Sequence, residues 1–167
     1  MRRSALALGA LTLILAATTA TAQDKPNFSG TWTLVVDPNA APPAGGGRGG
    51  RGGGRGLGAG ATLTQDDKTL TIVRTTQMGE IRTVYNLDGS DSKNTVTMGG
   101  NSMEQVSKAV WDGNKLVVTT NQMMGENAVT ITQTFMLDAS GQLVVSVTAP
   151  GRGGGEPVTT TQTYKKG

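Results

Sequence analysis

The stretch DGNKLVVT, residues 112–119, contains the two signals from which the fold of this chain follows. Asp, Gly and Asn are residues that tight turns prefer, and the β-branched run after them is typical of a strand. DDKTLTIV at 66–73 and ASGQLVVS at 139–146 place Leu and then Val or Ile shortly after similar turn residues. This weak internal repeat predicts a meander built from hairpins.

The same signals continue through the rest of the chain. Short alternating runs are separated by turn residues, and no run has the apolar spacing of an amphipathic helix. We therefore predict an all-β protein with ten antiparallel strands, at residues 28–36, 61–65, 69–76, 80–87, 94–98, 104–111, 115–121, 128–137, 142–149 and 158–165.

The connections between these strands fall into two groups of different composition. Those after the even strands are tight and acidic, at 66–68, 88–90, 112–114 and 138–141. Those after the odd strands are rich in Gly, Arg and Met, at 38–60, 77–79, 99–103, 122–126 and 150–157. Because successive antiparallel strands reverse direction, we expect each group to gather at one end of the molecule, a tight end and a loose end.

The N-terminus resembles an export signal. Arg2 and Arg3 precede an apolar run, and Ala20-Thr21-Ala22 provides a small-x-small cleavage site before Gln23. The run is too short to span a bilayer. We expect a signal peptide at 1–22, a single mature domain at 23–167, and a secreted or periplasmic location. The chain has no Cys, which excludes disulfide bonds and a lipid anchor on cysteine.

The glycine-rich stretch PPAGGGRGGRGGGRGLGAG, residues 42–60, is typical of RNA-binding segments in intracellular proteins. Without Arg2 and Arg3, however, 13 Lys and Arg face 12 Asp and Glu, so the mature net charge is only about +1. Such a balance is unlike that of a nucleic-acid-binding protein. We predict a flexible insertion at about 38–60 and no nucleic-acid partner.

The opening of the first strand, NFSGTW at 27–32, resembles the Gly-x-Trp motif of the calycins, which include the lipocalins and the fatty-acid-binding proteins. Ten meandering strands, a long first connection and a last strand ending in Gln162-Thr163-Tyr164 look most like the fatty-acid-binding branch. The WDG and DG hairpins are similar to secreted bacterial lipocalin-like proteins. The resemblance implies a ten-stranded antiparallel up-and-down β-barrel that holds a small apolar or amphiphilic molecule.

The chain differs from that family in its last strand and in its first connection. The family's Arg-x-Tyr is here Gln162-x-Tyr164, so a fatty carboxylate loses its usual cationic partner and we expect neutral or zwitterionic ligands to be favoured. The first connection is rich in Gly and Pro, which disfavours a helical lid.

Strand alternation places three polar residues on apolar faces. Arg74 shares a face with Leu70 and Ile72, Gln133 lies among apolar residues of the eighth strand, and Gln162 precedes Tyr164 by two positions. A buried polar group needs a partner or water. These residues therefore either satisfy one another inside a ligand-binding cavity, or they reach water at one end of the barrel.

Methionines on the loose connections suggest a further candidate site. Met78, Met103, Met123 and Met124, together with Met98, are predicted around one rim. Thioethers are soft ligands that select Cu(I), and they also serve as an adaptable apolar lining for a ligand. Both interpretations remain open.

Other chemistry has little support in the sequence. The absence of His and Cys excludes imidazole and thiol catalysis and the usual zinc sites, and the acidic turns lack the ligand density of a calcium loop. We expect no enzyme activity, no metal site and no cofactor, with Trp32 and Trp111 as packing residues at the tight end. The predicted function is binding or carriage of a small molecule by a monomer. The alternative is a secreted structural or surface-interaction module with a filled core.

Overall fold

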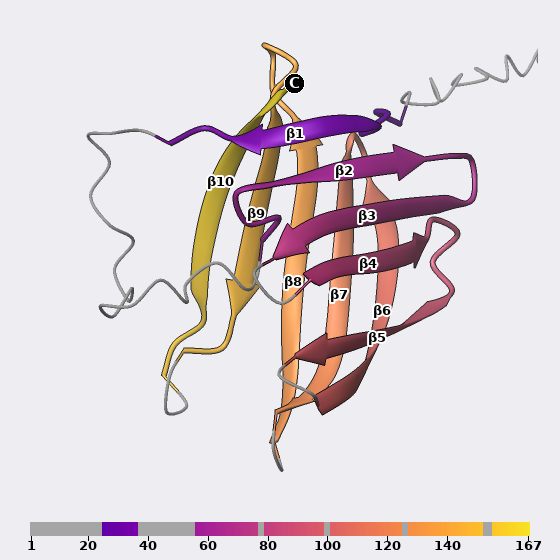
Figure 1. Ribbon diagram of the computed structural model, residues 1–167, viewed down its shortest axis with the longest axis vertical. Helices are drawn as coiled ribbons and strands as arrows, with labels where there is room; N and C mark the ends of the chain where they lie inside the picture. Colours follow the sequence, from indigo (N-terminus) through magenta and orange to yellow (C-terminus); the bar gives the residue numbers. More distant parts are fainter. Residues whose placement is uncertain (1–24, 37–55, 77–78, 99–100, 125–126, 152–154) are drawn as a thin grey trace, which may run out of the picture.

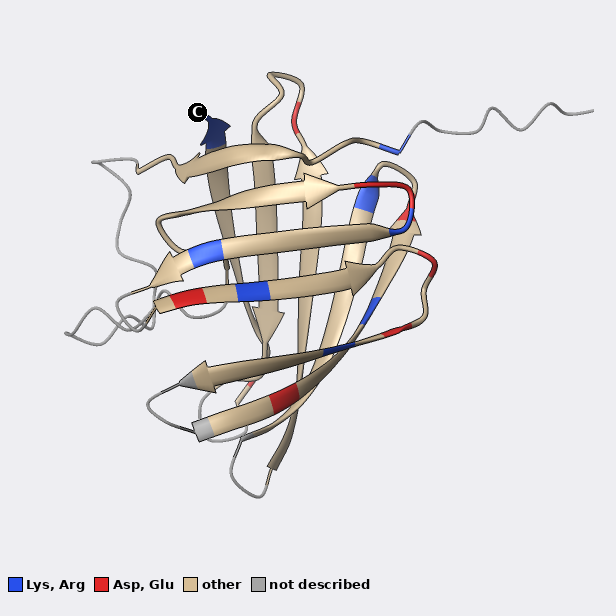
Figure 2. Cartoon of the chain, turned by 45° about the vertical axis from the view of Figure 1, so that its right-hand side comes forward, with Lys and Arg blue, Asp and Glu red and all other residues tan. Residues whose placement is uncertain are grey.

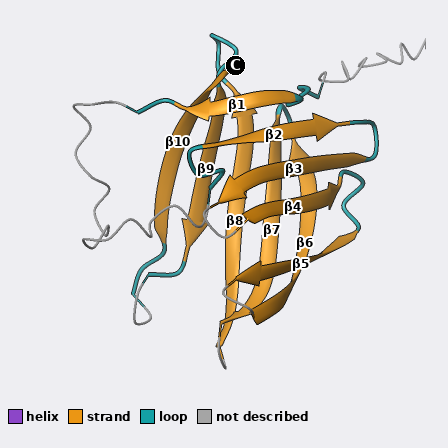
Figure 3. Ribbon diagram, in the orientation of Figure 1, coloured by secondary structure: helices purple, strands orange, loops and turns teal. Residues whose placement is uncertain are grey.

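Ten β-strands form the framework of the protein in this computed structural model, which describes residues 25–36, 56–76, 79–98, 101–124, 127–151 and 155–167. Within these ranges the chain consists of strands and loops, with no helix (Figure 3). The predicted signal peptide and most of the predicted insertion at 38–60 lie outside the described residues. The strands are β1 (Gly30–Leu34), β2 (Gly60–Gln65), β3 (Thr69–Thr76), β4 (Gly79–Asn86), β5 (Asp91–Met98), β6 (Asn101–Asp112), β7 (Lys115–Met124), β8 (Asn127–Leu137), β9 (Leu143–Ala149) and β10 (Val158–Lys166).

The strands form one antiparallel sheet in the order β4-β3-β2-β1-β10-β9-β8-β7-β6-β5. Strands that follow one another pair with one another except at β4 and β5, and β1 pairs with β10, with Trp32 opposite Lys166. The sheet folds over, so that β1 to β5 cross in front of β6 to β10 (Figure 1). The predicted all-β fold, a ten-stranded up-and-down barrel of calycin type, is confirmed in strand number, direction and order.

β4 and β5 are the two edge strands of the sheet, and side chains of β5 connect them where backbone pairing between strands is interrupted. The Asn94 side chain accepts a hydrogen bond from the Val84 backbone N–H at 2.8 Å and donates one to the Val84 carbonyl at 2.9 Å. The Ser92 hydroxyl accepts one from the Asn86 backbone N–H at 2.7 Å. The Asn94 amide thus replaces a backbone peptide group, so that the edge of β4 is not left unpaired. We call Ser92 and Asn94 with their β4 partners the seam.

Four strands have a boundary two or three residues away from the prediction. β6 begins at Asn101 rather than at residue 104, and β7 ends at Met124 rather than at residue 121. β1 begins at Gly30 rather than at residue 28, because the Phe28 backbone bonds to side chains: its N–H donates to Gln65 Oε1, and its carbonyl accepts from Trp32 Nε1. β5 begins at Asp91 rather than at residue 94.

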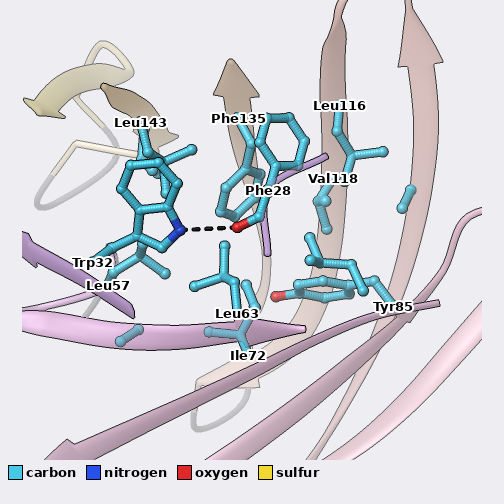
Figure 4. Packing of buried hydrophobic residues seen from close by; sticks show 14 of the residues in the cluster. Phe28, Trp32, Leu57, Leu63, Ile72, Tyr85, Leu116, Val118, Phe135 and Leu143 are labelled. Atoms are coloured by element: carbon cyan, nitrogen blue, oxygen red, sulfur yellow. Dashed lines mark hydrogen bonds between the residues drawn. The ribbon is translucent and has the colours of Figure 1, made fainter. Parts of the chain in front are cut away.

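An apolar core fills the tight end, as expected from the sequence. Trp32, Phe28 and Phe135 pack together there with Leu116 and Leu143 (Figure 4). Trp32 is 2% exposed, and its indole N–H donates to the Phe28 carbonyl at 2.8 Å. Its predicted role as a packing residue at the tight end is confirmed. We call this region the closed end.

Trp111 also packs at the closed end. Its ring stacks on that of Phe28, with 5.8 Å between the ring centroids. The Lys25 ammonium lies over the Trp111 ring, 5.6 Å from the ring centroid, where it forms a cation–π contact. The predicted packing role of Trp111 therefore agrees with its position.

Aspartates organise the hairpin turns at the closed end. The Asp66 carboxylate accepts hydrogen bonds from the backbone N–H groups of Lys68 and Thr69, at 2.8 and 2.6 Å. These bonds hold the pKa of Asp66 below its ordinary value. Asp138 accepts from Ser140 and from the Gln142 backbone, which also lowers its pKa. These contacts are those of turn-forming residues.

The outer face is rich in threonine, and charged residues are unevenly distributed over it. Hydroxyl pairs link neighbouring strands, with Ser146 and Thr161 at 2.9 Å and Thr148 and Thr159 at 2.7 Å. In the described residues, charged side chains gather on β4 to β6, on the turns and near the C-terminus (Figure 2), whereas the one charged residue of β3 is the inward Arg74. Cross-strand hydroxyl pairs stabilise a sheet without charge.

Candidate functional site

The barrel interior changes character beyond the closed end. The inward faces of β3, β8 and β10 carry apolar residues or tyrosine at the closed end and a polar residue further along, at Arg74, Gln133 and Gln162. On β8 the inward face is apolar again at Ile131. Two tyrosines, Tyr85 and Tyr164, lie at the boundary and are 6% and 0% exposed. We call Arg74, Tyr85, Gln133, Gln162 and Tyr164 the polar belt.

Tyr164 connects the last strand to the chain segment before β2. Its hydroxyl lies 3.0 Å from Gln162 Oε1 and 3.2 Å from the Gly58 carbonyl oxygen, and its single proton is shared between these two acceptors. Burial raises the pKa of Tyr164 to about 12. The phenol is therefore a neutral hydrogen-bond donor at ordinary pH.

Tyr85 joins the belt from β4. Its hydroxyl donates to Gln133 Oε1 at 3.3 Å, across the interior from β8. Burial raises the pKa of Tyr85 to about 12, and the Arg74 guanidinium opposes this rise. Figure 4 shows the Tyr85 ring next to Ile72 and Leu63, with its hydroxyl directed into the barrel. Sequence analysis did not identify Tyr85 as a site residue. Tyr85 lies on the same buried face of the chain as Thr83 and Leu87, at every second position.

Arg74 is the cation of the belt. Its side chain is half-buried, and its Nη1 donates to the Gly56 carbonyl at 2.7 Å. The guanidinium lowers the pKa of both phenols against the larger effect of burial, which places its charge near both tyrosines. Within the described ranges the ion pair found is Lys108 with Asp91 at 3.6 Å, and both are exposed. The structure thus places a guanidinium inside the barrel without a described carboxylate partner.

The segment at 56–58, shortly before β2, enters the barrel, and its Gly56 carbonyl accepts the hydrogen bond from Arg74. Leu57 is 3% exposed and belongs to the apolar core, and Gly56 is buried beside it. Figure 4 shows Leu57 against Trp32. The sequence held one signal for this arrangement, since Leu57 is the single large apolar side chain between residues 37 and 60.

A second set of polar side chains lies inside the barrel on β6 and β7. Gln105 donates to Gln122 Oε1 at 2.6 Å, and the hydroxyls of Ser107 and Thr120 are 2.8 Å apart. Ser107 and Thr120 are 2% and 6% exposed. In the part of the chain that the structure describes, every buried polar side-chain atom has a hydrogen-bond partner. The polar interior is therefore internally satisfied.

The predicted site residues are thus only partly brought together. Arg74, Gln133, Gln162 and Tyr164 all contribute to one interior belt. Met103 is half-buried on the inward face of β6, whereas Met123 is 54% exposed on the outward face of β7. The structure does not gather these two methionines into one site. Met78 lies outside the described residues, as does the Met124 side chain.

The described residues contain no group of three or more His, Cys, Asp or Glu side chains placed to hold a metal ion. They also contain no helix with the length and apolar character needed to cross a membrane. The polar belt itself offers donors, from Arg74 and the two phenols, above an apolar floor. Such a pairing suits an amphiphilic molecule whose polar group accepts hydrogen bonds.

Comparison with known proteins shows a likeness in structure but not in sequence family. Neither a protein-family model nor a curated protein sequence matches the chain. The chain is similar to a solved structure of zebrafish ileal bile acid-binding protein complexed with cholic acid. The two are 20% identical, with a TM-score of 0.47, over 65% of this chain and 72% of that one.

Proposed function

We propose that the protein binds a small amphiphilic molecule inside the barrel and carries it in the periplasm or outside the cell. The apolar part of the ligand lies against the floor formed by the closed end, and its polar group lies at the belt. The observation that carries the proposal is the interior guanidinium of Arg74. Arg74 is half-buried, and the described residues show no carboxylate paired with it. A partly desolvated cation without a carboxylate partner stabilises a core less than an apolar side chain of similar volume does. Arg74 is better suited to binding than to packing.

The position of Arg74 extends the class of ligands expected from the sequence. Neutral or zwitterionic ligands were expected because Gln162 replaces a cation on the last strand. Arg74 supplies a cation from β3 to the neighbourhood of the same tyrosine, Tyr164. The proposed ligands therefore include anionic amphiphiles, whose acceptor oxygens form charge-assisted hydrogen bonds with a guanidinium.

A ligand panel tests this function. The fluorescent probe 1-anilinonaphthalene-8-sulfonate is bound first, and oleic acid, oleyl alcohol and methyl oleate are then compared as competitors. We expect the acid to compete at about tenfold lower concentration than the alcohol, because only the acid forms an ion pair with Arg74. Arg74→Gln should remove this preference. Arg82→Gln is the matched control, since Arg82 is exposed on the neighbouring strand.

The alternative function, a structural module with a filled interior, is favoured by one observation. Leu57 and the Gly56 carbonyl already occupy part of the space and one donor that a ligand requires. Folded wild-type protein that takes up neither the probe nor any lipid of the panel supports this alternative. The copper hypothesis stays a prediction, which a titration with Cu(I) under reducing conditions tests.

A further inference from the structure

The segment Gly56–Leu57–Gly58 contacts the polar belt with its backbone carbonyls and the apolar core with its Leu57 side chain. Arg74 Nη1 donates to the Gly56 carbonyl at 2.7 Å, and the Tyr164 hydroxyl to the Gly58 carbonyl at 3.2 Å. Between these two carbonyls, the Leu57 side chain is buried in the apolar core at 3% exposure. The segment therefore presents two acceptor oxygens to the belt and a branched apolar group to the floor.

The fit of this segment against the belt depends on glycine. A Cβ added at Gly56 would overlap Gln162 Oε1 and lie 3.5 Å from the Tyr164 hydroxyl. Gly58 has φ +69°, a backbone conformation that side chains with a Cβ rarely adopt. The backbone of the segment thus packs directly on the belt and reaches its donors without intervening side-chain atoms.

We propose that Gly56–Leu57–Gly58 is an internal pseudo-ligand, which occupies the belt in the absence of a ligand and is displaced when one binds. This inference rests on the proposed function. It identifies the polar group of the ligand as a hydrogen-bond acceptor, because Arg74 and Tyr164 donate to carbonyl oxygens in the present state. It also makes Leu57 a determinant of affinity, because a ligand must displace its side chain from the core.

The apparent affinity equals the intrinsic affinity multiplied by the fraction of molecules in which the segment has left the belt, so a small fraction weakens binding. Truncating Leu57 weakens the hold of the segment and raises that fraction. We expect Leu57→Ala to bind 1-anilinonaphthalene-8-sulfonate about tenfold more tightly than wild type. Leu87→Ala is the matched control, because Leu87 is a leucine of similar burial that follows β4 at the closed end, away from the belt. It should leave the affinity within about twofold.

Gly56→Ala provides a second route to the same result. The added methyl group displaces the segment from Gln162 while leaving the core leucine intact, so probe affinity should again rise. Circular dichroism and tryptophan fluorescence establish that each variant is folded.

Amide hydrogen exchange measures the displacement itself. Peptides that cover residues 56–59 should exchange faster when wild-type protein is saturated with the probe. If exchange there becomes slower, the segment stays in place and packs on the ligand, and the inference is wrong.

The outcomes separate this inference from the proposed function. Tighter binding by Leu57→Ala and Gly56→Ala, with Leu87→Ala unchanged, supports the pseudo-ligand. Equal binding by wild type and both segment variants overturns the pseudo-ligand and leaves the binding function standing. If no folded form of the protein binds the probe or competes with lipids, the proposed function is wrong and the pseudo-ligand with it.

Discussion

The two halves of the barrel interior use different means of cohesion. At the closed end, Trp32, Phe28 and Phe135 pack with aliphatic side chains, and aspartates organise the turns outside them. At the polar belt, cohesion comes from hydrogen bonds between side chains and from carbonyls of the segment that contains Leu57. Apolar packing stabilises more than internal hydrogen bonds do. The difference suggests that the closed end supplies stability, while the belt supplies a surface that can exchange partners.

The largest expected effect compares two residues of β8 that share the inward face. Phe135→Ala should lower the free energy of unfolding by about 3 to 5 kcal/mol, because it opens a cavity at the closed end. Gln133→Ala should cost only about 1 kcal/mol, the net contribution of a hydrogen bond. Urea unfolding followed by tryptophan fluorescence measures both. Equal losses would show that the two halves do not differ in cohesion.

The second prediction concerns the ionisation of tyrosine at high pH. Tyrosine titration reports on the belt, because Tyr85 and Tyr164 are the two tyrosines of the chain and both belong to the belt. Burial raises both pKa values to about 12 from the ordinary value of 10.0. The neutral phenols therefore contribute stability below pH 10, which is lost as the pH rises from 10 to 12. For Tyr85 this loss is about 2 to 3 kcal/mol.

Phenolate absorbance during a pH titration measures this effect. In folded protein at pH 11 both phenols should remain mostly protonated, and in urea at the same pH both should ionise. A folded protein whose tyrosines ionise at pH 10 would contradict their placement inside the barrel.

A smaller effect is expected at the seam between β4 and β5. Asn94→Ala leaves the Val84 backbone N–H and carbonyl without their side-chain partner, at a cost of about 2 kcal/mol in the free energy of unfolding. Thr95→Ala is the control, since Thr95 is the adjacent exposed residue of the same strand. Thermal unfolding of the two variants makes the comparison. If they lose the same stability, the Asn94 amide does not hold the seam.

Local patterns were sufficient to predict the framework. Turn residues and β-branched alternation located all ten strands, and alternation alone placed Arg74 and Gln133 on inward faces. The first boundary was wrong because the Phe28 backbone bonds to the side chains of Gln65 and Trp32, which alternation does not reveal.

Features that depend on closure of the barrel could not be predicted. The seam joins Asn94 to Val84 through a side chain, and a side chain that replaces a peptide group leaves no periodic signal. Leu57 lies in a glycine-rich run whose composition is typical of a loop, so its burial follows only from the space that the closed barrel provides. Tyr85 belongs to the site because the folded sheet brings β4 opposite β8.

Native mass spectrometry of the protein purified from its own host tests the central claim most directly. The account predicts one organic molecule bound per chain, with an acceptor group such as a carboxylate, and loss of that adduct in Arg74→Gln but not in Arg82→Gln. The bare polypeptide mass, together with no uptake of an apolar dye by the folded protein, would contradict it.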